Sequence, residues 1–155
     1  MKKKRRSNKG FTLMELLIVM AILGLLATIG LGSFRSSQIK GRDAQRKSDL
    51  SQIQKALEMY YNDYSGYPET LPAGGSSWLD ATKRTLYMKE VPKDPKDPAQ
   101  KYLYQQKNNG TSYALYATVE NTNDSCFKSG VCKDYGITCG KENCNYGVAS
   151  ANVSP

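Results

Sequence analysis

The sequence predicts an α+β protein, in which one long N-terminal helix packs on a small antiparallel β-sheet and a C-terminal tail is held by disulfides. Three observations lead to this fold class. No proline precedes Pro68, and apolar residues recur at helical spacing in the first part of the chain. Two stretches rich in tyrosine, leucine and alanine flank the tetrapeptide KNNG, and four cysteines lie in the last 30 residues.

The predicted helix runs from about residue 11 to about residue 61, and its two halves differ. Residues 11–34 carry one charge, that of Glu15, and as a helix they would span roughly 36 Å, enough to cross a bilayer. Farther along, apolar residues recur every three or four positions, so one face packs and the other meets water. These residues are Leu50, Ile53, Leu57, Tyr60 and Tyr64. The weak points of the helix are Gly24, Gly30, Gly32 and Gly41.

The rest of the chain predicts short elements. Prolines and glycines interrupt the region up to residue 98, where residues 78–86 are expected to form a short helix. Residues 102–106 and 112–119 are strand candidates, and KNNG between them is a strong hairpin signal. A two-stranded hairpin is marginal by itself, so we expect it to pack on the amphipathic half of the helix in one head domain.

Charge is concentrated at one end of the chain. The formal net charge is +8, but six of the 22 basic residues lie in the first nine positions. Without residues 1–10, 16 basic residues face 14 acidic ones, which leaves +2. Basic residues before the only apolar span place that side in the cytoplasm and the head outside. A charge of +2 gives no reason to expect a nucleic-acid partner.

The composition argues against an enzyme. The chain has no histidine, which removes the usual general base near neutral pH and the commonest metal ligand. We find neither a nucleophile beside a base nor an open metal site, and therefore predict no catalytic residue and no cofactor. An anchored extracytoplasmic enzyme is an alternative that an uncut peptide around residues 9–11 in the mature protein would support.

The cysteines predict covalent cross-links. They lie in a segment rich in glycine, asparagine and lysine that cannot build much of a core, and outside the cytoplasm they are expected to form two disulfides. Their spacings, with five, six and four residues between them, lack the tight pair of a structural zinc site. All three pairings of Cys126, Cys132, Cys139 and Cys144 remain open.

The junction KGFTLME, residues 9–15, carries the clearest motif. It resembles the processing signal of type IV prepilins and type II secretion pseudopilins. The resemblance implies cleavage by prepilin peptidase between Gly10 and Phe11, N-methylation of Phe11, and a role for Glu15 in pairing with the free α-amino group of a neighbouring subunit. A carboxylate inside a membrane span is costly, so a partner for Glu15 is expected. Gly32 lies where many pilins have a proline that accompanies local melting of the helix.

The resemblance also predicts organisation, partners and location. Residues 1–10 are the leader peptide, 11–34 the transmembrane and assembly half of the helix, and 35–155 the extracytoplasmic head. The partners are other copies of the chain in a helical polymer, prepilin peptidase with its methylase activity, the inner-membrane assembly platform and the membrane itself. The precursor is expected in the cytoplasmic membrane, and the assembled protein in an extracellular filament or a periplasmic pseudopilus.

Residues 87–121 resemble pseudopilin G, in which a K-D-P turn leads into paired strands. Pseudopilin G usually continues with an acidic calcium-binding loop, whereas this chain enters the cysteine-containing tail. Asp124 and Asp134, with Glu142, are the weak calcium candidates, because they lack the alternating oxygen ligands of a calcium loop. The leading hypothesis is a structural subunit of a type IV pilus-like filament. The alternatives are a type II secretion pseudopilin and, less favoured, a DNA-uptake pilus subunit.

Overall fold

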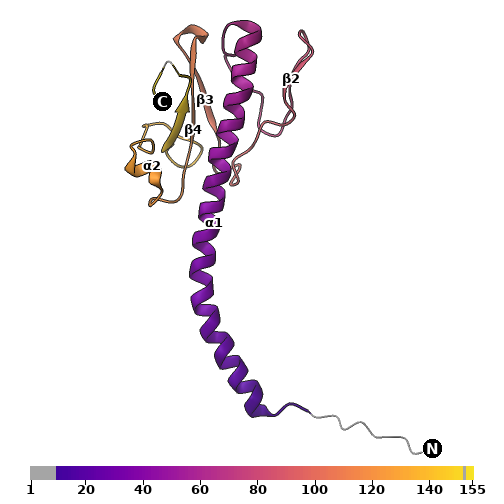
Figure 1. The fold of residues 1–155 in the computed structure, drawn as a ribbon, viewed down its shortest axis with the longest axis vertical. Helices are drawn as coiled ribbons and strands as arrows, with labels where there is room; N and C mark the ends of the chain where they lie inside the picture. The colour runs from indigo at the N-terminus through magenta and orange to yellow at the C-terminus, as the bar shows by residue number, and fades with distance from the viewer. Residues whose placement is uncertain (1–9, 152) are drawn as a thin grey trace, which may run out of the picture. The chain divides into compact units, whose positions relative to one another are not determined.

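The computed structural model describes residues 10–151 and 153–155, and for residues 29–31 only the backbone. Most of the predicted leader peptide therefore lies outside the described residues. The chain divides into two compact units, Met1–Gln38 and Ile39–Pro155. Helix α1, Leu13–Tyr64, contributes to both units (Figure 1). The long N-terminal helix is confirmed, and it ends three residues later than the pattern predicts.

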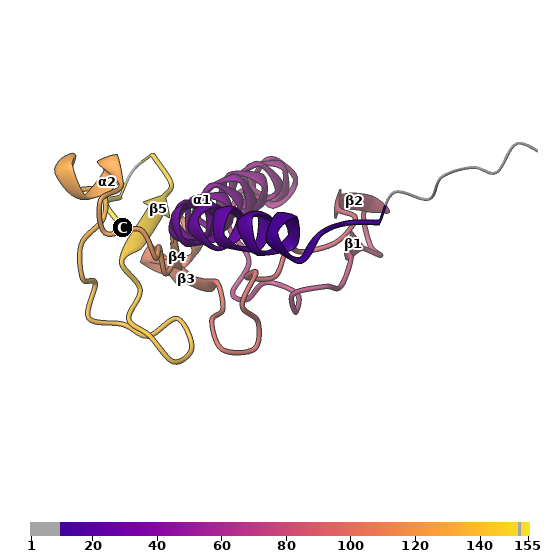
Figure 2. The same cartoon turned by 90° about the horizontal axis from the view of Figure 1, so that it is seen from below.

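The second unit contains two antiparallel sheets on different sides of α1 (Figure 1 and Figure 2). The larger sheet has the order β3-β4-β5, formed by β3 Leu103–Lys107, β4 Ser112–Ala117 and β5 Tyr146–Ala149. The predicted hairpin is confirmed: β3 pairs with β4 in register, and the 3-10 turn η1, Asn108–Gly110, joins them. The α+β fold class is therefore confirmed.

The smaller sheet corrects the sequence analysis, because residues 78–86 do not form a helix. They belong to a hairpin of β1 Trp78–Asp80 and β2 Thr85–Met88. Trp78 and Tyr87 are buried against Tyr60 of α1. This packing favours strands, because alternate side chains of a strand point to opposite faces. The Asp80 carboxylate accepts hydrogen bonds from the backbone of the turn that follows it.

The core lies between α1 and β4. Strand β4 is buried along its whole length, with alternate residues on opposite faces. Tyr113, Leu115 and Ala117 pack with residues of α1, namely Leu50, Ile53, Ala56 and Leu57, as the helical spacing predicted. Ala114 and Tyr116 on the other face pack with Cys139 and Cys144.

The C-terminal segment is more than a stapled tail. Helix α2, Ser125–Lys128, and strand β5 are both formed from it, and β5 hydrogen-bonds to β4 as the third strand of the sheet. The expectation of a tail with little core is wrong. Buried cysteines and Tyr146 supply apolar contacts that the polar composition of the segment conceals.

Candidate assembly site

The predicted cleavage junction lies just before the first turn of α1. Gly10, Phe11 and Thr12 are not helical, and α1 begins at Leu13. The Phe11 side chain is 86% exposed, and a side chain added at Gly10 would meet no atom within 4 Å. Backbone on both sides of the Gly10–Phe11 bond is therefore accessible within the described chain. Cleavage and methylation at this bond stay predictions.

Glu15 caps the start of α1. Its Oε2 atom accepts hydrogen bonds from the Thr12 backbone nitrogen at 2.8 Å and the Thr12 hydroxyl at 2.9 Å. In return, the Glu15 backbone nitrogen donates to the Thr12 hydroxyl at 3.2 Å. This reciprocal capping box satisfies N–H groups that a helix start leaves without partners. Glu15 also lies only four positions after Phe11, whose amino group cleavage would free.

The first half of α1 presents an apolar surface. Among the described residues, α1 is the one helix long and apolar enough to cross a membrane. None of its most apolar 18-residue stretch is buried. The large exposed side chains are those of Leu13, Met14, Leu16, Leu17, Ile18, Val19, Met20, Ile22, Leu23, Leu25, Leu26 and Phe34. Such a surface requires a bilayer or another protein to cover it.

A buried charge cluster organises the head. We define the Arg46 cluster as Arg42, Asp43, Arg46, Asp94, Lys96, Gln100 and Glu120. Arg46 is fully buried, and each of its five N–H groups donates a hydrogen bond. Two go to Asp94, and one each goes to Asp43, Glu120 and Gln100, at 2.7–3.0 Å. The cluster therefore joins α1 to the 94–100 loop and to the residues after β4.

The charges of the cluster balance, with three cations and three carboxylates. Glu120 receives a bidentate pair from Arg42, at 2.9 and 2.7 Å, and an ion pair from Lys96 at 2.7 Å. Asp43 accepts the backbone N–H groups of Glu120 and Asn121, so it fixes the chain where it leaves β4. Every buried polar side-chain atom in the described part of the chain has a hydrogen-bond partner.

The pKa values follow from these contacts. Hydrogen bonds from Arg42, and then from Lys96 and Arg46, hold the pKa of Glu120 well below its ordinary value despite its partial burial. Burial alone would lower the pKa of Arg46, but its hydrogen bonds to Asp94, Glu120 and Asp43 outweigh burial and raise it. Both shifts favour the charged forms of Arg46 and Glu120.

The sequence analysis missed this cluster, although a signal was present. Asp43 and Arg46 precede Leu50, Ile53 and Leu57 at intervals of three or four residues, so they continue the buried face of α1. A charged residue on a buried face needs a charged partner. Asp94 of the K-D-P turn is that partner.

The structure pairs the cysteines as neighbours in sequence. Cys126 bonds to Cys132, and Cys139 bonds to Cys144. The Cys139–Cys144 loop lies along residues 99–101. The backbone nitrogen of Lys101 donates to the Cys139 carbonyl and that of Lys141 to the Ala99 carbonyl, both at 2.9 Å. The Glu142 carboxylate accepts a hydrogen bond from Gln100 at 2.7 Å. This disulfide loop therefore supports the Arg46 cluster from outside.

The backbone of that loop requires glycine at position 140. Gly140 has φ +103°, which side chains rarely allow. A Cβ atom there would lie 2.5 Å from the Ala99 carbonyl oxygen. The loop can approach residues 99–101 this closely only without a side chain at this position.

The candidate calcium ligands have other partners. Asp124 forms an ion pair with Lys47 at 2.7 Å and caps α2 by accepting from the Cys126 backbone nitrogen. Asp134 accepts from the Gly136 backbone and from Asn143. Within the described residues, no group of three or more Cys, Asp or Glu side chains could hold a metal ion. Both candidate carboxylates are therefore engaged in contacts within the head, and the expectation of no cofactor stays a prediction.

Comparisons with known proteins agree with these features. Residues 5–31 match the family model described as the prokaryotic N-terminal methylation motif. The chain is 33% identical over 108 residues to type II secretion system core protein G of Vibrio cholerae, covering 65% of this chain and 74% of that protein. The chain belongs to the type IV pilin and type II secretion pseudopilin family. No solved structure is significantly similar to it.

Other members of the family show the same relationship. The identity to core protein G of Pseudomonas aeruginosa is 32% over 109 residues, covering 64% of this chain and 76% of that protein. The identity to the type IV major pilin protein PilA of Myxococcus xanthus is 34% over 62 residues, covering 40% of this chain and 28% of that pilin. Membership in this family implies a prepilin-processing motif and polymerisation of the chain into a filament.

Proposed function

We propose that this chain is a structural subunit of a type IV pilus-like filament, processed between Gly10 and Phe11 and polymerised through α1. It performs no catalysis. The precursor sits in the cytoplasmic membrane, prepilin peptidase removes residues 1–10 and methylates Phe11, and an inner-membrane platform adds the subunit to the filament.

One observation carries this proposal: an exposed, non-helical processing junction is followed at once by an unburied apolar helix. Before assembly, a bilayer can cover this surface, and in a filament the helices of other copies can cover it. Glu15 is the one charge in this surface and stands at its start. In the polymer, its carboxylate would exchange the Thr12 contacts for the amino group of a neighbouring Phe11.

The second candidate is a pseudopilin that works in the periplasm in type II secretion. The identities to core protein G favour it, since they cover about three quarters of two such proteins. The disulfide-braced segment after residue 121, in place of an acidic calcium loop, favours the surface filament. Both candidates share the processing and polymerisation steps.

Expression from the native gene followed by shearing tests the proposal. We expect the protein in filaments of the sheared surface fraction. A Gly10→Val variant, with a branched side chain beside the scissile bond, should remain at precursor mass and form no filaments. The control Gly41→Ala, at an open helical position, should behave as wild type. Mature protein retained only in the periplasm would favour the secretion pseudopilus.

A further inference from the structure

Two leucines form an exposed apolar pair on the β1–β2 hairpin. Leu79 and Leu86 are direct cross-strand partners, 59% and 51% exposed. We call them the leucine pair. Side chains paired across two strands lie close together on one face. The two leucine side chains therefore form one apolar patch exposed to solvent on this hairpin.

The hairpin that carries the leucine pair is firmly anchored. On its inner face Trp78 and Tyr87 are buried, with ring centroids 5.7 and 5.3 Å from that of Tyr60. The Tyr87 hydroxyl donates to Asp63 at 2.7 Å, and the Tyr64 hydroxyl donates to Asp80. Anchoring on one face holds the other face in a fixed position. A contact through the leucine pair would therefore lose little conformational entropy of the hairpin.

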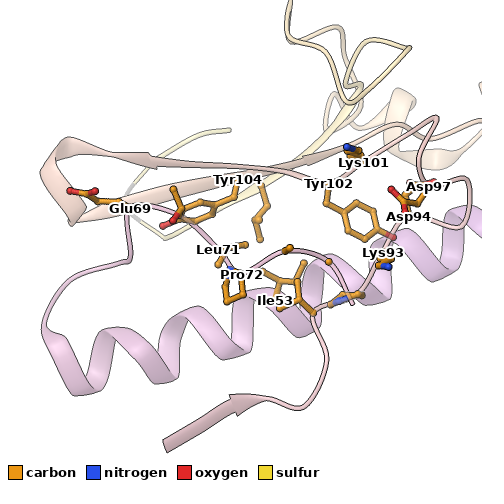
Figure 3. Close-up of a pocket in the computed structure, with 16 residues that line it drawn as sticks. Ile53, Glu69, Leu71, Pro72, Lys93, Asp94, Asp97, Lys101, Tyr102 and Tyr104 are labelled. Atoms are coloured by element: carbon orange, nitrogen blue, oxygen red, sulfur yellow. The ribbon is translucent and has the colours of Figure 1, made fainter. Parts of the chain in front are cut away.

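The same head has an apolar groove elsewhere on its surface. We define the groove by Ile53 of α1, Leu71 and Pro72 of the following loop, and Tyr102 and Tyr104 at β3 (Figure 3). Its volume is about 520 Å³. Glu69 lies at one end, and Lys93, Asp94, Asp97 and Lys101 lie at the other (Figure 3). An apolar middle with charged ends suits an apolar pair flanked by charge.

We propose that the leucine pair of one subunit inserts into the apolar groove of a neighbouring copy of this chain. The inference rests on the proposed function, in which copies of the head are packed along one filament. The two surfaces are different parts of one head, so the contact is heterologous, and a heterologous contact that does not close generates an open helical filament. Arg84, in the turn beside the leucine pair, is opposite in charge to Glu69 at the end of the groove.

The first test removes the leucine pair from the full-length chain in the cell that makes the filament. Leu79→Ser/Leu86→Ser should lower the yield of sheared filaments by roughly tenfold or more, because burial of two leucine side chains is lost. Val131→Ser, an exposed apolar residue of the C-terminal segment, is the matched control and should leave the yield unchanged. Mature mass and protease resistance of the membrane-held subunit show that processing and folding persist.

The second test uses charge and needs no change in apolar surface. Arg84→Glu and Glu69→Arg should each reduce filament yield, and the double variant should recover at least part of the loss. Recovery requires the two side chains to meet, which a structural role of either one does not predict.

The outcomes separate this inference from the proposed function. Wild-type filaments together with normal filaments from the leucine variant would overturn the inference and leave the proposed function standing. Loss in the leucine variant with no effect of either charge reversal would show that the pair packs against another surface, which overturns the groove as its partner. Absence of filaments from wild-type cells would overturn both.

Discussion

Arg46 of α1 forms a two-point ion pair with Asp94, 48 positions farther along the chain. The Nε–Oδ2 distance is 2.7 Å, the second N–O distance is 3.0 Å, and both side chains are fully buried. The remaining N–H groups of Arg46 bind Asp43, Glu120 and Gln100. One helical residue therefore positions the loop before β3 and the chain after β4.

Replacing Arg46 should destabilise the head strongly. Arg46→Met leaves carboxylates buried without their partner, and we expect a loss of about 3–5 kcal/mol in the free energy of unfolding. Arg42→Met removes only a partly exposed pair with Glu120 and should cost no more than about 1 kcal/mol. Urea unfolding of the full chain in detergent, followed by fluorescence of the single tryptophan, Trp78, measures both. Equal losses would contradict the central position of Arg46.

Stability should fall in acid through Glu120. The folded pKa of Glu120 lies below its ordinary value of 4.5, so its contribution is present above about pH 4.5 and is lost as the pH falls toward the folded pKa. Burial raises the pKa of Asp49, which opposes part of this loss in the same range. Glu120→Gln should flatten the decline in unfolding free energy below pH 4.5. An unchanged pH profile would exclude Glu120 as a source of the decline.

The Cys139–Cys144 disulfide should support the head without calcium. Cys139→Ser/Cys144→Ser should lower the unfolding free energy by about 2 kcal/mol, as expected for a short closed loop. Because Asp124 and Asp134 already have partners within the head, we expect unfolding in calcium and in chelator to coincide for both wild type and variant. Calcium that raised the stability of either protein would contradict this prediction.

Gly140 should tolerate no side chain. Gly130→Ala, which has a positive φ but open space, should lose about 1 kcal/mol through backbone strain alone. Gly140→Ala adds a clash with the Ala99 carbonyl, and its loss should be roughly twice as large or more. Thermal unfolding of the two variants side by side measures the difference. Equal losses would mean that residues 99–101 move away easily.

The sequence predicted the elements whose pattern is local. Leu50, Ile53 and Leu57 mark the buried face of α1, and KNNG marks the hairpin between β3 and β4. The processing motif is also local, because a peptidase reads adjacent residues. These features need no knowledge of what lies across the fold.

The remaining features depend on distant partners. The segment 78–86 is short and mixed in composition. Its pairing as strands depends on packing against Tyr60 of α1. Strand β5 forms by hydrogen bonding to the edge of β4. The partners of Arg46 come from three separate segments. The disulfide pairing also follows from tertiary packing, since the spacings alone allow three choices.

The most direct test of the filament account is the N-terminal residue of the protein recovered from sheared surface material. Mass spectrometry of the terminal peptide should find an N-methylated phenylalanine at position 11, because the proposed processing after Gly10 would free the amino group that the proposed assembly uses. An intact Met1, or an N-terminus beyond Gly32, would contradict the account and leave a membrane-anchored or secreted protein that does not polymerise through α1.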